Sequence, residues 1–468
     1  MRRMLVVLLP LLAACASLPA ERGYSEATTE VSTRIGHAPP SDLLSLEPTR
    51  PAVPEGEIGI GQALDLALRH NPELRREYAA LGISRAELEA ATRVHNPVFS
   101  IARLGIESGT EIARSVALAF TDLLTMPDRR SMAELGQQRA EAEVAQAILK
   151  MAHQVEQAWY ELISAEQHAA LAQLIRQANR QRAELADRMV TAGTLPASHA
   201  AEYRATAAET AIAATRAEAE RLEARLELAN LLVLPIEANW SVPMHLPEPK
   251  AVQFSDEELL AQARAERLDL KALDRAVAEH ERSLASVKRW RFVGDVELEY
   301  EHEQADGEAD KQGPGLTLAL PIFDQGQAEL ERAKAALAGA RAERDAAWYA
   351  LGNELYAARA GLHSAAEVAR VYQRVLLPSQ ERVVDGHQQE LNFMLKGPFE
   401  LLSVRAEQYA AHGEYLEAVR DYWLARAQLR MLAGGRLPDA PLYEAGQPEV
   451  GIDQFLPKAG APDPHAHH

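Results

Sequence analysis

The chain has a single cysteine, few aromatic residues and no motif of a common enzyme class. Cys15 stands alone, which excludes an intrachain disulfide and any CxxC metal or redox motif. Aromatic residues make up 5% of the 468 residues against 47% hydrophobic residues, and this composition favours closely paired helices over a thick core. No nucleophile elbow, P-loop or HExxH sequence occurs. We therefore expect a protein that is not an enzyme and has no catalytic cofactor.

Acidic residues outnumber basic ones. Asp and Glu total 68 against 49 Lys and Arg, for a formal net charge of −19 at pH 7. A chain of this charge is repelled by polyanions, so we expect neither nucleic acid nor anionic lipid surfaces as partners.

The N-terminus has the pattern of a secretory signal over residues 1–14. Arg2 and Arg3 precede an apolar run from Leu5 to Leu12 that is too short to span a bilayer. The Leu-Ala-Ala-Cys segment ending at Cys15 resembles a bacterial lipobox. That resemblance implies cleavage before Cys15, an N-terminal lipid on Cys15, and sorting to the outer membrane. The alternative is an ordinary signal peptide cut at a small-residue site.

The remainder divides into a tether, two similar units and a tail. Residues 15–56 are rich in Pro, Ser, Thr and Glu, which predicts an extended, lipidated N-terminal tether. Helical periodicity begins near Ile58. We expect units at 57–240 and 254–435, a proline-containing linker at 241–253, and a His-containing tail at 436–468. No stretch after the signal approaches the ~20 apolar residues of a membrane helix, so we expect any membrane crossing to be made by strands.

Each unit is predicted to contain helix, strand, strand, very long helix and helix, in a mainly α fold with a small β part. Strands are expected at 98–104 and 115–123 in the first unit, and at 295–303 and 315–323 in the second. Leu118 matches Leu318 at an offset of 200, and Gly193 matches Gly397 at an offset of 204. Slowly growing offsets indicate a duplicated unit with small insertions.

The third predicted strand is amphipathic. Its apolar residues alternate with acids, namely Val296, Leu298 and Tyr300 against Asp295, Glu297, Glu299 and Glu301. This pattern suits lipid on one face and water on the other; the alternative is an edge strand of a soluble sheet. Four strands cannot close a membrane barrel, so several chains would have to pool them, and three chains would give twelve. The acids would then make a lumen that favours cations.

Several short segments resemble one family in their order and spacing. They are Asn71-Pro-Glu-Leu74, Gly193-Thr-Leu with Ala201-Glu-Tyr, Leu318-Ala-Leu-Pro-Ile-Phe-Asp-Gln-Gly326, Phe399-Glu-Leu-Leu402 and Tyr415-Leu-Glu-Ala-Val-Arg-Asp-Tyr422. Together they resemble the TolC family of outer-membrane efflux proteins over about residues 57–435. The resemblance implies a homotrimer with a twelve-stranded barrel in outer-membrane lipid, continued by a periplasmic α-helical barrel. It also implies a periplasmic adaptor (membrane fusion) protein and an inner-membrane pump as partners.

The same resemblance assigns roles to two chain breaks and one proline. Gly193, Thr194 and Leu195 in the first unit, with Gly397 and Pro398 in the second, are implied to form the periplasmic tips that bind the adaptor. The alternative is simple hairpin geometry, since glycine suits left-handed backbone whatever docks there. Pro321 is implied to be the joint between barrel and helices, at the periplasmic edge of the membrane.

We therefore expect a passive export conduit of a tripartite efflux system for small molecules or metal ions. The alternative is a periplasmic coiled-coil lipoprotein that acts as a scaffold or adaptor without a pore. The C-terminal His465, His467 and His468 suit a weak site for soft or borderline divalent ions; the alternative is an incidental tail.

Overall fold

The computed structural model describes residues 24–37, 54–106, 109–251, 254–305, 309–438 and 448–455. The expected signal, Cys15 and the three C-terminal histidines lie outside these residues. Within them, no helix has both the length and the apolar character needed to cross a bilayer.

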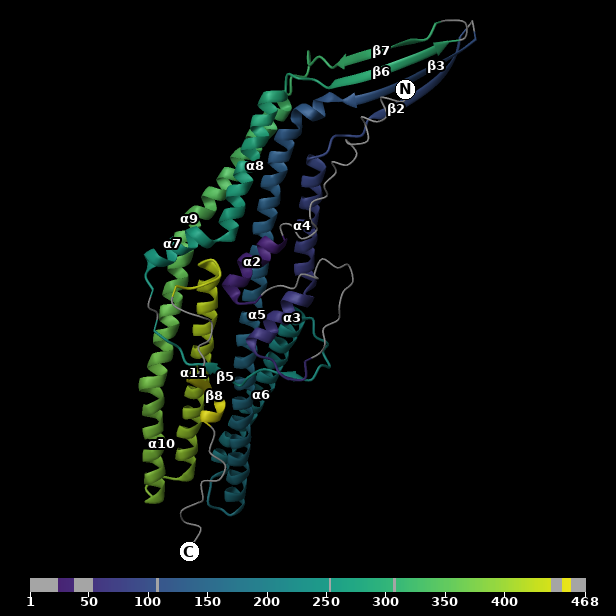
Figure 1. The fold of residues 1–468 in the computed structure, drawn as a ribbon. Coiled ribbons are helices and arrows are strands. Elements are labelled where there is room, and N and C mark those ends of the chain that lie inside the picture. The colour runs from purple at the N-terminus through teal and green to yellow at the C-terminus, as the bar shows by residue number, and fades with distance from the viewer. Residues whose placement is uncertain are drawn as a thin grey trace. The chain divides into compact units, whose positions relative to one another are not determined.

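The described chain is mostly helical with a small β part, as predicted (Figure 1). Its helices are α2 (Tyr24–Ile35), α3 (Ile60–His70), α4 (Pro72–Ala91), α5 (Phe120–Thr191), α6 (Ala197–Leu232), α7 (Asp256–Glu266), α8 (Leu268–Trp290), α9 (Gln327–Val371), the π-helix η2 (Tyr372–Leu376), α10 (Leu377–Asn392), α11 (Pro398–Leu432) and the 3-10 helix η3 (Ile452–Gln454). Its strands are β1 (Gly56–Glu57), β2 (Val98–Ile106), β3 (Gly109–Ala119), β4 (Trp240–Ser241), β5 (His245–Pro247), β6 (Val296–Ala305), β7 (Lys311–Leu318) and β8 (Glu449–Gly451).

Two runs of elements follow the predicted order. Helices α3 and α4, strands β2 and β3, and helices α5 and α6 form the first run; α7 and α8, β6 and β7, and α9 to α11 form the second. In the second run the long helix is interrupted by η2, where the amide of Leu377 bonds to the carbonyl of Tyr372.

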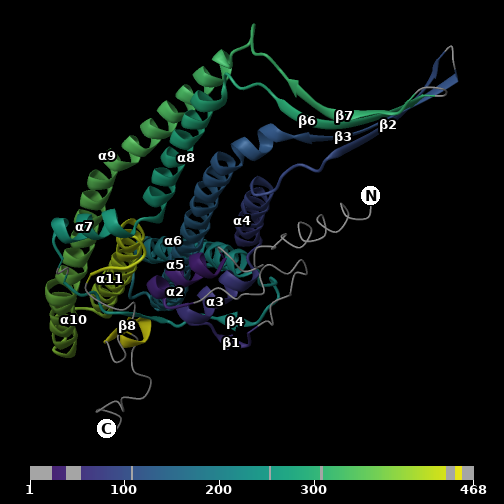
Figure 2. The ribbon, with the colours of Figure 1, turned by 45° about the horizontal axis from the view of Figure 1, so that its top comes forward.

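The chain folds into two compact units that differ from the predicted sequence halves. The strand unit contains Arg75–Ala147 and Leu268–Ala350, with the first turns of α2. Its four strands form one antiparallel sheet in the order β2-β3-β6-β7. The ribbon views show these strands running side by side and curving together (Figures 1 and 2). Below the sheet, Val277 of α8 packs with Leu337 and Ala340 of α9.

The helix unit contains Val31–Leu74, Ile148–Arg267 and the chain from Leu351 onward. Alanines 169 and 172 of α5 pack against alanines 214 and 217 of α6, the close packing that the composition favours. Bulkier aromatic residues lie in the core, where Tyr160 stacks on Trp423 at 5.8 Å between ring centroids. The indoles of two buried tryptophans donate to backbone carbonyls, Trp159 to Ile58 (3.0 Å) and Trp423 to Pro247 (2.7 Å).

The N-terminal segment differs from the predicted extended tether because it contains α2. Ala27, Val31 and Ile35 lie four residues apart, so they share one face of a helix, and all three are buried. The linker also contains short strands: β4 pairs with β1, and β5 pairs with β8 of the tail.

Two strand boundaries were predicted too far along the chain. Strand β3 ends at Ala119 and α5 begins at Phe120, so Pro127 lies inside the helix. In the preceding turn the hydroxyl of Thr125 bonds to the carbonyl of Thr121, and the guanidinium of Arg129 bonds to the carbonyl of Asp122 (3.2 Å). Strand β7 ends at Leu318, three residues before Pro321.

Candidate functional site

The four-stranded sheet has one apolar face and one acidic face. In an antiparallel ladder, directly opposite residues lie on the same face. The ladder places Leu118 of β3 opposite Leu298 of β6, and Leu298 opposite Leu316 of β7. Register and alternation together give an apolar face made of Phe99, Ile101, Val116, Leu118, Val296, Leu298, Tyr300, Leu316 and Leu318.

This apolar face is uncovered in the single chain. Phe99 is 64% exposed, Leu298 42% and Leu316 66%. Large side chains in an apolar row of this length are normally buried against protein or lipid. The face is therefore a candidate surface for contact with other protein or with lipid.

The opposite face carries the predicted acids. Glu297, Glu299 and Glu301 lie on it, and the ladder extends the row to Glu303, which the sequence analysis did not assign. Glu303 is the last residue of the predicted strand 295–303 and continues the same alternation, so the sequence carried the signal for it. The cross-strand neighbours of Glu297, Glu299 and Glu301 are small, namely Ala117, Ala119, Ser115, Gly313, Gly315 and Thr317. Glu303 is instead opposite Lys311 of β7. Asp295 precedes the strand and accepts a hydrogen bond from the amide of Ala319 through its carbonyl (2.9 Å).

Both outer strands of the sheet have a free edge among the described residues, because β2 pairs only with β3 and β7 only with β6. An edge strand presents unpaired N–H and C=O groups that can bond to another strand. The sheet therefore has both an uncovered apolar face and two edges available for pairing.

Pro321 lies in the turn between β7 and α9. The chain on either side of this joint is held closely: a Cβ at Gly294 would lie 1.8 Å from the carbonyl oxygen of Ala319, so only glycine fits there. The turn exposes apolar side chains, with Ile322 66% and Phe323 97% exposed.

The first predicted tip joins α5 to α6 in the helix unit. Gly193 adopts φ +71°, and the amides of Gly193 and Thr194 bond to the carbonyls of Val190 and Met189. This left-handed turn ends α5. Thr194 is exposed and Leu195 half-buried, as expected for a loop between two helices.

The second predicted tip uses a different residue for the left-handed turn. Met394 adopts φ +55°, and the amides of Met394 and Leu395 bond to the carbonyls of Leu391 and Glu390 in the same pattern. Gly397 instead has φ −85° and caps α11, whose first residue is Pro398. The structural counterpart of Gly193 is therefore Met394, at an offset of 201, and the pairing of Gly193 with Gly397 was wrong.

The second tip is also more apolar than the first. Phe393, Met394 and Leu395 are 76%, 92% and 74% exposed. The ammonium of Lys396 bonds to Nε2 of His387 (3.0 Å) and pairs with Glu390 (2.8 Å), and this contact lowers the pKa of Glu390. Gly397 and Pro398 were the predicted tip residues, and the apolar triplet that precedes them was not predicted.

The two helical hairpins meet near these tips through stacked side chains. Tyr203 of α6 stacks on Phe399 of α11 at 4.5 Å between centroids. The guanidinium of Arg182 lies 4.4 Å from the Tyr203 centroid and donates to the carbonyl of Phe399 (3.3 Å). This contact fixes the two hairpins within the helix unit.

Comparison with known proteins supports the fold without a close relative in sequence. No protein-family model and no curated protein matches the chain. Among solved structures, the Campylobacter jejuni CmeC outer membrane channel aligns with a TM-score of 0.67 and 15% identity, over 85% of this chain and 92% of that one. The Neisseria gonorrhoeae MtrE outer membrane channel, in its open state, aligns with a TM-score of 0.64 and 18% identity, over 82% and 93%.

A third similar structure is CusC, described in terms of folding and transmembrane channel formation. It aligns with a TM-score of 0.65 and 16% identity, over 84% of this chain and 99% of that one. The expected likeness to the TolC-family outer-membrane channels is therefore confirmed for the fold.

Proposed function

We propose that this protein is the outer-membrane channel of an efflux system, a passive conduit with no chemistry of its own. The observation that carries the proposal is the sheet, which has an exposed apolar face and two free edges. Hydrocarbon tolerates no unpaired strand edge, so a sheet of four strands enters a membrane only by pairing with further copies. Three copies supply twelve strands and close the ring.

The two faces then have defined roles. The apolar face lies against outer-membrane lipid, and the face with Glu297, Glu299, Glu301 and Glu303 lines the lumen, where the neighbours of the first three acids are small. Acidic side chains around a pore attract cations and repel anions. The expected lumen therefore favours cations.

The helix unit extends into the periplasm in this proposal, and its tips meet the adaptor of an inner-membrane pump. Small molecules or metal ions delivered by that pump would pass through the lumen. Gly193, Thr194 and Leu195 form one contact point, and the second is the turn from Phe393 to Pro398, with its exposed apolar triplet. Cys15 carries the lipid anchor.

The test is single-channel conductance of the purified full chain in planar bilayers. We expect detergent to be required for purification and discrete conductance steps on insertion. A chain that stays monomeric and soluble without detergent, and gives no conductance, would exclude the conduit.

A further inference from the structure

We propose that basic side chains at both ends of the apolar face bind the headgroups of anionic phospholipids and so fix the depth of the sheet in the bilayer. The inference rests on the proposed function, because it requires the apolar face to lie in a membrane. The first row is Arg103, Arg114 and His302, and the second is Lys288 and Arg291 with the apolar turn Ile322–Phe323.

The first row lies on the apolar face itself, toward the hairpin loops. Arg114 is directly opposite Ile101 of β2 and His302 of β6, and Arg103 is opposite Ile112. The ladder thus places these cations immediately beyond the apolar rows of Phe99 and Tyr300.

The second row lies at the other end, where α8 leads into β6. A Cβ at Gly326 would be 3.0 Å from Cβ of Arg291, so the end of α8 and the start of α9 are in contact beside the exposed turn. Both ribbon views show the chain between β7 and α9 projecting as a narrow loop (Figures 1 and 2). Phe292 is 54% exposed, and the guanidinium of Arg291 lies 4.2 Å from its ring centroid.

Four of these basic residues are available to an external anion, whereas His302 lies 3.7 Å from the carboxylate of Asp310. Among the residues that the structure describes, Arg103, Arg114, Lys288 and Arg291 make no ion pair. By contrast, their neighbour Arg289 pairs with Asp128 (3.1 Å), which also accepts from the indole of Trp290 (2.8 Å). A cation in the last turn of α8 also stabilises the helix dipole, but Arg291 follows the helix and the two strand arginines have no such role.

The two rows lie beyond opposite ends of the apolar part of β6. From Val296 to His302 the strand rises by six residue steps, about 20 Å at roughly 3.3 Å per residue. Phe292 lies four residues before Val296, in a turn followed by an irregular segment. Basic and aromatic side chains at such borders reach the headgroup level.

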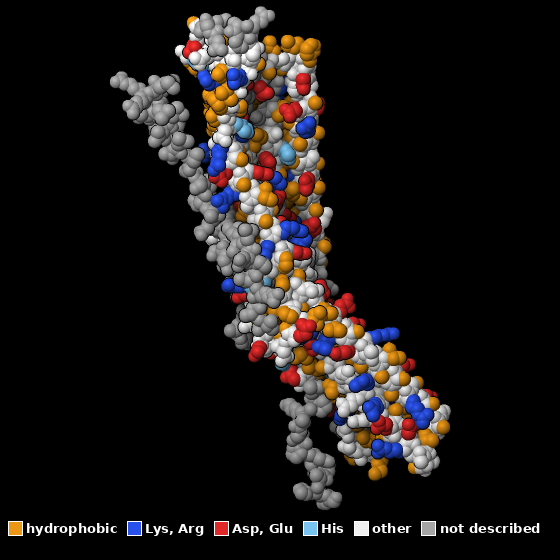
Figure 3. Space-filling view, turned by 90° about the vertical axis from the view of Figure 1, so that its right-hand side faces the viewer, with side chains coloured by type: hydrophobic (Ala, Val, Ile, Leu, Met, Phe, Trp, Pro, Cys, Tyr) orange, Lys and Arg blue, Asp and Glu red, His pale blue; other side chains and the backbone are white. Residues whose placement is uncertain are grey.

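The net charge of −19 does not oppose this proposal. Acidic and basic side chains are interspersed over the face shown in Figure 3, so the charge does not form one acidic surface there. The expectation that anionic lipid surfaces are not partners was drawn from the net charge of the whole chain, whereas these two rows are local, and the proposal departs from that expectation here. Interfacial attraction is set by charges within about a Debye length.

The first test measures depth. A nitroxide label is attached to the variant Phe323→Cys and, as the control, to Phe393→Cys at the helical tip. Both full chains are reconstituted in phosphatidylethanolamine–phosphatidylglycerol vesicles. The unsubstituted chain, treated with the same label, gives the baseline signal for Cys15. We expect the label at 323 to relax preferentially with membrane-soluble oxygen and the label at 393 with a water-soluble nickel complex. A label at 323 that is as aqueous as the one at 393, or shielded from both reagents by a second copy of the chain, overturns the proposal.

The second test measures the role of charge. Added phosphatidylglycerol should raise the unfolding temperature of the solubilised chain more than phosphatidylcholine does. The double variant Lys288→Glu with Arg291→Glu should lose at least half of that difference, whereas Arg216→Glu, an exposed arginine of α6, should keep it. The proposal is overturned if phosphatidylglycerol exceeds phosphatidylcholine by the same rise in unfolding temperature in the unaltered chain, the double variant and Arg216→Glu. Oligomer mass and conductance are measured on each preparation, so a failure of the channel itself is distinguished from a failure of lipid binding.

Discussion

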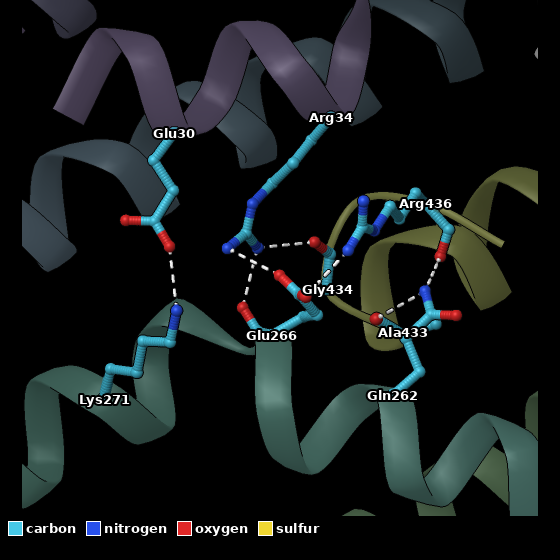
Figure 4. A network of polar contacts seen from close by, with 8 residues as sticks. All are labelled: Glu30, Arg34, Gln262, Glu266, Lys271, Ala433, Gly434 and Arg436. Atoms are coloured by element: carbon cyan, nitrogen blue, oxygen red, sulfur yellow. Dashed lines mark hydrogen bonds and ion pairs between the residues drawn. The ribbon is translucent and has the colours of Figure 1, made fainter. Parts of the chain in front are cut away.

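Arg34 of α2 is a buried cation that joins three segments of the helix unit (Figure 4). Its guanidinium donates to the carbonyls of Glu266 (2.6 Å) and Gly434 (2.7 Å) and pairs with the Glu266 carboxylate (3.1 Å). Gln262 donates to the carbonyl of Ala433 nearby (3.3 Å). The contact is close, since a Cβ at Gly434, which has φ +92°, would lie 2.7 Å from Cβ of Glu266.

Replacement of Arg34 by alanine should lower stability by about 3 kcal/mol, because Glu266 and two helix-end carbonyls lose a buried partner. Arg34→Lys should recover only part of the lost stability, since an ammonium cannot make the several coplanar hydrogen bonds of a guanidinium. The control Arg76→Ala removes a side chain that is 77% exposed, and should cost less than about 1 kcal/mol. Thermal or denaturant unfolding measures both; equal losses for Arg34→Ala and Arg76→Ala would contradict this role.

His412 of α11 gives the C-terminal segment a pH dependence. Its ring stacks on Phe455 at 3.9 Å, and burial lowers the pKa of His412 to about 4. The unfolded chain has a histidine pKa near 6.5, so it binds a proton first as the pH falls. His412 therefore stabilises the fold fully above about 6.5, and that stability is lost as the pH falls toward 4.

Acidification from pH 7 to pH 4 should cost on the order of 2 kcal/mol through this residue. His412→Phe should flatten the dependence while keeping the stack, and His363→Phe, at an exposed site of α9, should not. Unfolding temperatures between pH 4 and 7 check this. An unchanged slope in His412→Phe would assign the dependence to other groups, such as His153, whose pKa burial also lowers.

At the scale of elements, the two helical turns have the same backbone conformation but place different residue types at the left-handed position. Gly193 and Met394 both adopt positive φ, which costs a non-glycine residue about 1 kcal/mol. Gly193→Ala should therefore destabilise its turn by about 1 kcal/mol, and Met394→Gly should stabilise the other by a similar or smaller amount.

Hydrogen exchange at the amides of Thr194 and Leu395 measures these changes locally, because each amide bonds across its turn. Gly397→Ala is the matched control: Gly397 has φ −85°, and its Cβ would meet only the flexible side chain of Glu400. A larger loss at Gly397 than at Gly193 would contradict the assignment of the left-handed positions.

Alternation in the sequence predicted which strand residues share a face, because side chains alternate strictly along a strand whatever lies around it. It could not locate the strand ends, since those depend on hairpin pairing: β6 and β7 extend together to Ala305 and Lys311. Composition also gave a wrong prediction for α2. The segment is rich in proline and polar residues and was predicted to be extended, although Ala27, Val31 and Ile35 form one buried helical face. At the first tip, Gly193 correctly predicted the left-handed position. At the second tip, Gly397 predicted it wrongly, because Met394 occupies that position.

At the scale of the whole molecule, the acidic face predicts ion selectivity. The combined variant Glu297→Gln, Glu299→Gln and Glu301→Gln should reduce the preference for potassium over chloride several-fold, because it removes charge at constant side-chain size. Reversal potentials under a salt gradient measure this. The control Glu407→Gln lies on α11 in the helix unit and should leave them unchanged. Anion preference in the unaltered channel would refute an acidic lumen.

The central claim is that the open sheet of one chain is completed by other copies. The most direct measurement is the protein mass of the purified complex in detergent, obtained by light scattering with the detergent contribution subtracted. Given a chain of 51.3 kDa, the proposal predicts roughly three times that mass, less the signal segments. A mass equal to one chain, in a preparation that retains its folded helices, would contradict the claim.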